Sequence, residues 1–172
     1  SERVDFIPAL RMVVHIFPFD RSLPHLAGVL GGAARGFEPA LRSALGPGEW
    51  QAGADTLGVT PYRTELGAAL RYTLRARDAL TSRSQTLRCY LKVYRNERGE
   101  ETFRFLRDWA ARAPERSEQY SLVQPIAYLS ELRTLVLEEA PGASLQQLLL
   151  ERREPLDAMR RVARAVAAFH LE

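Results

Sequence analysis

Two residues of this sequence have types and spacing suited to ligand binding: Lys92 and, two positions earlier, Tyr90. Lys92 is the only lysine among the 24 lysine and arginine residues. Lysine is a compact point charge on a slim stem and arginine is a broad planar fork, so one lysine in an arginine-rich chain points to a site where a guanidinium would not serve. The arginine bias itself is typical of genome base composition. A lone exposed lysine beside a partly buried tyrosine is therefore the competing interpretation.

The segment around this pair alternates as a strand does. In residues 87–94 (LRCYLKVY), Leu87, Cys89, Leu91 and Val93 occupy every second position. Residues two apart share one face of a strand, so Tyr90 and Lys92 are predicted to face the same space.

Alternation and helical periodicity also predict the elements that position this pair. We expect residues 12–17 to form a buried strand, residues 58–67 to separate two strands, and residues 77–85 to form a hairpin loop. Antiparallel strands with one inserted helix indicate an α+β fold rather than a parallel α/β sheet. The expected elements are strands at 12–17, 66–76, 87–94, 122–129 and 133–138, and helices at 22–30, 37–45, 100–112, 144–153 and 156–169.

The chain is predicted to have three parts. Residues 1–50 would form a small N-terminal α/β extension, a possible cap on the second part. Residues 51–140 would form that second part, the antiparallel sheet with its inserted helix. Residues 141–172 begin with Pro-Gly and would form a linker and the first helices of a further, helical unit.

The composition argues against several other classes of protein. The apolar fraction of 46% and the charged fraction of 26% are typical of a soluble globular chain. No apolar run reaches 18 residues and no basic start precedes an apolar stretch, so we expect neither a membrane segment nor a signal peptide. One cysteine, Cys89, excludes an internal disulfide and fits a reducing cytoplasm. The net charge is only +3 and acids interleave with the arginines, so we expect no nucleic-acid partner.

The order of elements, together with these residues, resembles the N-terminal lobe of the aminoglycoside phosphotransferase and choline kinase-like family, which has a protein-kinase-like fold. The resemblance covers about residues 55–170. Residues 87–94 are similar to the third strand of that lobe, whose lysine holds the α- and β-phosphates of the nucleotide. The resemblance therefore implies that Lys92 contacts phosphate and that Tyr90 stacks on the adenine base.

The helix expected at residues 100–112 is similar to the helix that supplies a glutamate to this lysine in kinase-like folds. Glu100 and Glu101 both lie in its first turn. The resemblance favours Glu101 as the partner of Lys92. Acids in a first turn also suit the helix dipole, so helix capping is the competing interpretation.

Residues 135–145 (LVLEEAPGASL) resemble the strand and linker that join the two lobes of this family. Main-chain groups read the adenine there. The resemblance implies that the Glu138 carbonyl accepts from the adenine amino group, that the Ala140 N–H donates to a ring nitrogen, and that Leu137 lies behind the base. An ordinary junction from strand to turn to helix would have similar residues.

The sequence lacks two parts of the family's apparatus: a G-x-G-x-x-G phosphate loop and, after His170, the catalytic loop H-x-D-x-x-x-x-N. No catalytic or metal-ligating residue is therefore expected in this chain, which alone should be inactive. The resemblance implies ATP or GTP and Mg²⁺ as cofactors, with the metal ligands and the site for a small hydroxyl-bearing substrate in a C-terminal lobe. The whole enzyme would phosphorylate that hydroxyl. The alternative is a non-catalytic kinase-like module for binding or assembly, a pseudo-kinase.

Overall fold

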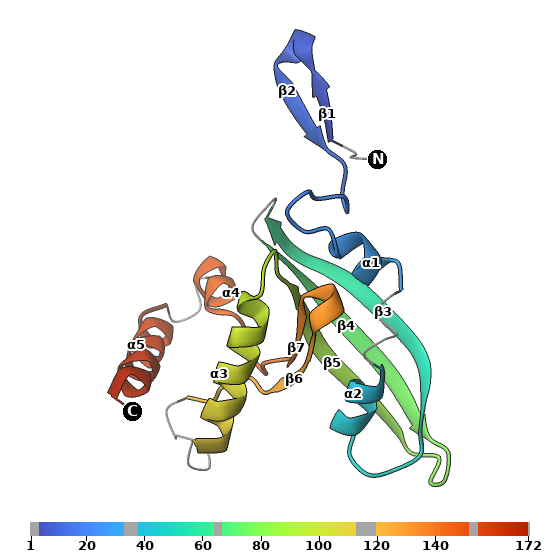
Figure 1. Cartoon of the computed structure of the whole chain (residues 1–172). Helices are drawn as coiled ribbons and strands as arrows, with labels where there is room; N and C mark the ends of the chain where they lie inside the picture. The colour runs from blue at the N-terminus through green and yellow to red at the C-terminus, as the bar shows by residue number, and fades with distance from the viewer. Residues whose placement is uncertain (1–3, 33–37, 64–66, 113–119, 152–154, 172) are drawn as a thin grey trace.

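The structure, a computed structural model, describes residues 4–32, 38–63, 67–112, 120–151 and 155–171. It is an α+β arrangement of antiparallel sheets and helices (Figure 1), as the sequence predicts. The strands are β1 (Val4–Ile7), β2 (Met12–His15), β3 (Trp50–Arg63), β4 (Gly67–Asp78), β5 (Ser84–Val93), β6 (Pro125–Leu129) and β7 (Thr134–Glu138), and the helices are α1 (Leu26–Leu30), α2 (Glu38–Ala44), α3 (Arg98–Arg112), α4 (Leu145–Leu150) and α5 (Pro155–Leu171).

The larger sheet has five antiparallel strands in the order β3-β4-β5-β7-β6. Because side chains alternate across a strand, each face of this sheet collects every second residue. In β4 and β5 the alternation is sharp, and the buried residues of one strand oppose those of the other, as Leu70 opposes Leu91 and Tyr72 opposes Cys89.

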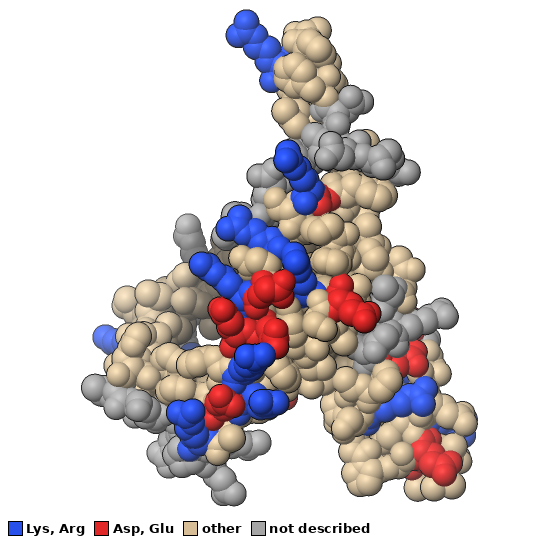
Figure 2. All heavy atoms as spheres, in the orientation of Figure 1, with Lys and Arg blue, Asp and Glu red and all other residues tan. Residues whose placement is uncertain are grey.

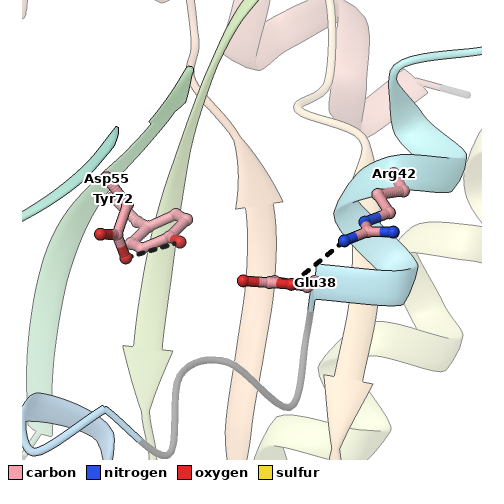
Figure 3. Close-up of polar contacts among 4 residues, drawn as sticks. All are labelled: Glu38, Arg42, Asp55 and Tyr72. Atoms are coloured by element: carbon pink, nitrogen blue, oxygen red, sulfur yellow. Dashed lines mark hydrogen bonds and ion pairs between the residues drawn. The ribbon is translucent and has the colours of Figure 1, made fainter. Parts of the chain in front are cut away.

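The first face of the sheet, which holds Leu70, Tyr72 and Leu91, is the core of the protein. Helices α1 and α2 cover it, and they contribute Leu26, Val29 and Leu41, none of which has exposed surface. These helices come from the second half of residues 1–50, so that part of the region packs on the sheet. Figure 3 shows a polar contact in this layer, where the Tyr72 hydroxyl donates to an Asp55 carboxylate oxygen at 3.0 Å. Burial, and then this hydrogen bond, raise the pKa of Tyr72, which keeps the phenol neutral.

The second face of the sheet, which holds Tyr90 and Lys92, is covered at one end by α3. A Cβ added at Gly99, near the start of α3, would meet ring carbons of Tyr94 and Tyr128, each at 2.8 Å. Only glycine lets the helix begin this close to the two rings. Farther along α3, the ring centre of Trp109 lies 4.9 Å from that of Phe169, with the rings tilted by 33°, and this contact connects α3 to α5.

The prediction of a strand at residues 12–17 is confirmed for Met12–His15, but the prediction that this strand is buried is wrong. Strand β2 ends at His15 and pairs only with β1, a strand that the sequence pattern does not indicate. The resulting two-stranded hairpin projects from the rest of the chain (Figure 1). An apolar run indicates a strand, but its burial requires a second layer, and no described element covers this hairpin. The exposed apolar side chains of this region are Phe6, Ile7, Leu10, Met12, Val13, Ile16 and Phe17.

Two expected loops are also shorter than predicted. Strands β4 and β5 extend to the pair formed by Arg77 and Ser84, so the hairpin loop expected at 77–85 is confirmed but is confined to residues 79–83. Strand β3 continues through residue 63, where a separate loop was expected at 58–67. The polar composition of residues 77–85 suggested a longer loop. Arg77 and Ser84 are instead exposed strand residues on an open sheet, where polar side chains face solvent without cost.

The burial of Cys89 gives a prediction about alkaline stability. Burial, followed by the charge of Glu139, raises the pKa of the Cys89 thiol from 9.0 to about 12. The unfolded chain loses this proton first, so the stabilisation is complete below pH 9 and is lost as pH rises toward 12. Urea unfolding at several pH values should show a decline of up to about 1.4 kcal/mol per pH unit from this group. The decline should be smaller in Cys89→Ala, and an equal decline in both proteins would contradict the prediction.

Candidate functional site

The candidate site lies on the second face of the sheet, where β5 and β7 are neighbours. Tyr90 is the cross-strand partner of Leu137, and Lys92 is the partner of Leu135 on the same side. On its other side Lys92 opposes Ala69 of β4, whose small side chain takes up little space. Tyr90 is half-buried and Lys92 is exposed, and they alternate with buried residues of β5. They therefore share a face, as the strand period predicts.

The residues after Leu137 continue along the end of β5. The Glu138 N–H donates to the Gln124 carbonyl at 3.0 Å, and the Glu138 carboxylate accepts from the Gln124 N–H at 2.9 Å. The Glu139 N–H donates to the Arg88 carbonyl at 3.2 Å. Ala140 is exposed, and its N–H has no hydrogen-bond partner among the described residues. Tyr90, Lys92, Leu137 and Glu138 thus lie along the paired stretch of β5 and β7, and Ala140 follows just after β7.

An ion-pair cluster joins the residues after β7 to the sheet. The Arg71 guanidinium lies 2.7 Å from a Glu139 carboxylate oxygen, and Arg88 lies 3.9 Å from the other oxygen. Arg71 is also the cross-strand partner of Tyr90. Glu139 therefore contacts two neighbouring strands, β4 and β5, and β5 also carries Tyr90.

This face of the sheet is strongly basic. Its described strand side chains include no carboxylate, and Glu139, just after β7, supplies one negative charge. By contrast, acidic and basic side chains interleave over α3, as Figure 2 shows. The positive field of this face would attract an anionic ligand. The cationic side chains of this face are Arg71, Arg75, Arg77, Arg88 and Lys92.

The expected ion pair between Lys92 and Glu101 is not formed in the structure. The Lys92 ammonium lies 5.2 Å from the ring centre of Tyr94, and no described carboxylate pairs with it. Glu100 pairs with Arg104, and Glu101 is exposed in the first turn of α3. Gly99 packs on the rings of Tyr94 and Tyr128, and this contact fixes where α3 begins. The first turn of the helix then leaves Glu101 in solvent. In that position its negative charge interacts favourably with the positive N-terminal end of the helix dipole.

Four further residues surround the pair: Arg71, Arg88, Glu139 and Tyr94. The strand period predicts that Arg88 and Tyr94 lie on the face of Tyr90 and Lys92, but no role in the site was predicted for either. Arg71 and Glu139 required the strand register and the strand order, which the period does not contain.

Among the described residues, no group of three or more His, Cys, Asp or Glu side chains is arranged to hold a metal ion. The helices in the described ranges are all too short or too polar to cross a bilayer. Comparisons with protein-family models, curated proteins and solved structures gave no match to this chain.

Proposed function

We propose that this chain is the nucleotide-binding part of an ATP- or GTP-dependent small-molecule phosphotransferase, similar to the aminoglycoside phosphotransferases. The observation that carries the proposal is the position of Tyr90 between Lys92 and the segment 137–140. An aromatic ring, a cation and a run of main-chain groups are the three parts needed to bind a base together with its phosphates.

In this proposal the base stacks on the ring of Tyr90, whose partial burial limits its motion. The Glu138 carbonyl accepts from the base, and the Ala140 N–H, which bonds to no described residue, donates to it. Lys92 lies one residue pair farther along the strand and contacts the phosphates. Its ammonium is exposed and lies over the Tyr94 ring, on the face of the sheet opposite the core.

The reaction in this proposal is transfer of the γ-phosphoryl group to a hydroxyl of a small molecule. Catalysis of this transfer depends on positioning and on neutralising charge. In this proposal the chain positions the nucleotide through its contacts with the base and the phosphates. Mg²⁺ would supply the neutralising charge, and the described residues offer no set of ligands for it. The metal ligands and the general base would therefore come from a further lobe.

Replacement of Tyr90 tests the proposal directly. Each stacked base is stabilised by roughly 1–3 kcal/mol, so Tyr90→Ala should raise the Kd for ATP and for adenosine by about 5- to 150-fold. Tyr90→Phe keeps the ring and should bind as the parent chain does. NMR titrations detect even millimolar binding and would measure both variants. A folded parent chain that fails to bind ATP would overturn the proposal.

A non-catalytic assembly module is the second candidate, and exposed apolar surface favours it. In the β1–β2 hairpin, Phe6 is 56% and Leu10 66% exposed, and in α5 Leu156 is 72% exposed. The hairpin also shows little charge on the face seen in Figure 2. Large apolar surfaces of this kind are typical of interaction sites. The same titrations separate the two candidates, because assembly through these surfaces requires no nucleotide.

A further inference from the structure

We propose that Glu139 is a positioning residue that holds the base-reading main chain against the sheet, so that its loss weakens recognition of the base but not of the phosphates. This inference rests on the proposed nucleotide site. It concerns a side chain, whereas the resemblance assigned roles in this segment to Leu137 and to the main chain of Glu138 and Ala140.

The contacts of Glu139 distinguish it from an ordinary surface acid. Its side chain is 22% exposed and contacts two arginines from two different strands, at 2.7 Å to Arg71 and 3.9 Å to Arg88. Its own N–H donates to the Arg88 carbonyl at 3.2 Å. Main chain and side chain of this one residue therefore both attach the segment to the sheet.

The place of Glu139 in the sequence gives this attachment its effect. It stands between Glu138 and Ala140, the two residues whose main-chain groups would read the base. Beyond it the chain reaches Pro141, which has no N–H, and Gly142, whose φ of +102° is in the left-handed region. Among the described contacts, those of Glu139 are therefore the ones that hold the C-terminal end of segment 137–140 against the sheet.

Glu139 also neutralises the cations beside the base. Arg71 and Arg88 flank Tyr90, one across the strand pair and one two residues earlier in β5. With the carboxylate present, their charge is partly compensated, and Lys92 is the cation at the phosphate end. Without it, two uncompensated guanidinium groups lie next to the ring, and guanidinium groups bind phosphate oxygens well. Loss of Glu139 should therefore affect base and phosphate in opposite directions.

The experiment uses Glu139→Gln, which keeps the size of the side chain and removes its charge. Three ligands are titrated: ATP, adenosine and inorganic tripolyphosphate. The Kd for adenosine should rise about three- to tenfold, the effect of losing one hydrogen bond of ordinary strength. The Kd for tripolyphosphate should stay the same or fall. The ratio of ATP affinity to tripolyphosphate affinity should therefore fall at least threefold.

The matched control is Glu97→Gln. Glu97 pairs with Arg133 at 3.1 Å and is 67% exposed, so this variant removes the same charge from an ion pair outside the site. It should leave the ratio unchanged. Amide hydrogen exchange gives a readout without ligand: the Glu139 N–H should exchange faster in Glu139→Gln, and not in Glu97→Gln.

The outcomes separate the two proposals. If the parent chain binds ATP and Glu139→Gln leaves the ratio and the exchange rate unchanged, the positioning role is overturned and the nucleotide site stands. An equal loss for all three ligands would also overturn it, because a general loss of structure does not distinguish base from phosphate. If the folded parent chain binds no ATP, the proposed function fails, and the base-reading role of Glu139 fails with it.

Discussion

Replacing Leu91 with alanine is expected to lower the free energy of unfolding by about 2–5 kcal/mol. Leu91 has no exposed surface, and its cross-strand partners are Leu70 and Val136. Truncation leaves a cavity in the core on the first face of the sheet, because the backbone of this middle strand is paired on both sides and cannot collapse inward. Urea unfolding followed by circular dichroism measures the change.

The control for this variant is Leu80→Ala, because Leu80 lies in the turn between β4 and β5 and is 73% exposed. The same atoms are removed there without creating a cavity, so the change should stay within about 0.5 kcal/mol. Equal effects at the two positions would show that Leu91 is not in a packed core. Leu91 stands between Tyr90 and Lys92, so its burial is also what directs those two side chains to the opposite face.

The placement of Tyr90 and Lys92 could be predicted because it depends only on the local period of one strand. The antiparallel sheet with its inserted helix follows from the same kind of signal, as does the Ser144 cap of α4, whose hydroxyl accepts from the Gln147 N–H. Each of these features is set by residues within a few positions of one another. The resemblance to a kinase lobe is a different matter and stays a prediction.

The ion pair of Arg71 with Glu139 could not be predicted in this way. The two residues are far apart in the sequence, and they meet because β4 and β7 both lie beside β5. Strand order depends on which arrangement buries the most apolar surface, and alternation within a single strand is the same for several arrangements.

The position of Glu101 depended on packing at atomic scale. Both acids in the first turn of α3 were candidates to reach Lys92. A small rotation of the helix about its axis determines whether either of them faces Lys92 or solvent. The contact of Gly99 with two tyrosine rings sets that rotation. A glycine in a sequence does not reveal which side chains will approach it.

Replacing Lys92 with alanine is expected to weaken binding of ATP and of tripolyphosphate by about tenfold or more, and to leave adenosine binding unchanged. A charged hydrogen bond contributes more than a neutral one, and the variant removes the only ammonium on this face. The separate responses of the three ligands would place Lys92 at the phosphates. They would also distinguish it from Tyr90, whose loss should weaken adenosine binding.

The matched control for Lys92→Ala is Arg107→Ala. The Arg107 guanidinium lies 5.6 Å from the ring centre of Phe103, as the Lys92 ammonium lies 5.2 Å from that of Tyr94. Both variants therefore remove one positive charge and one contact between a cation and a ring, but Arg107 lies on α3, outside the site. If both variants weaken tripolyphosphate binding equally, the effect is the general charge of the protein, and the phosphate role of Lys92 is wrong. A loss confined to Lys92→Ala requires a ligand phosphate beside β5, because the two changes are otherwise alike.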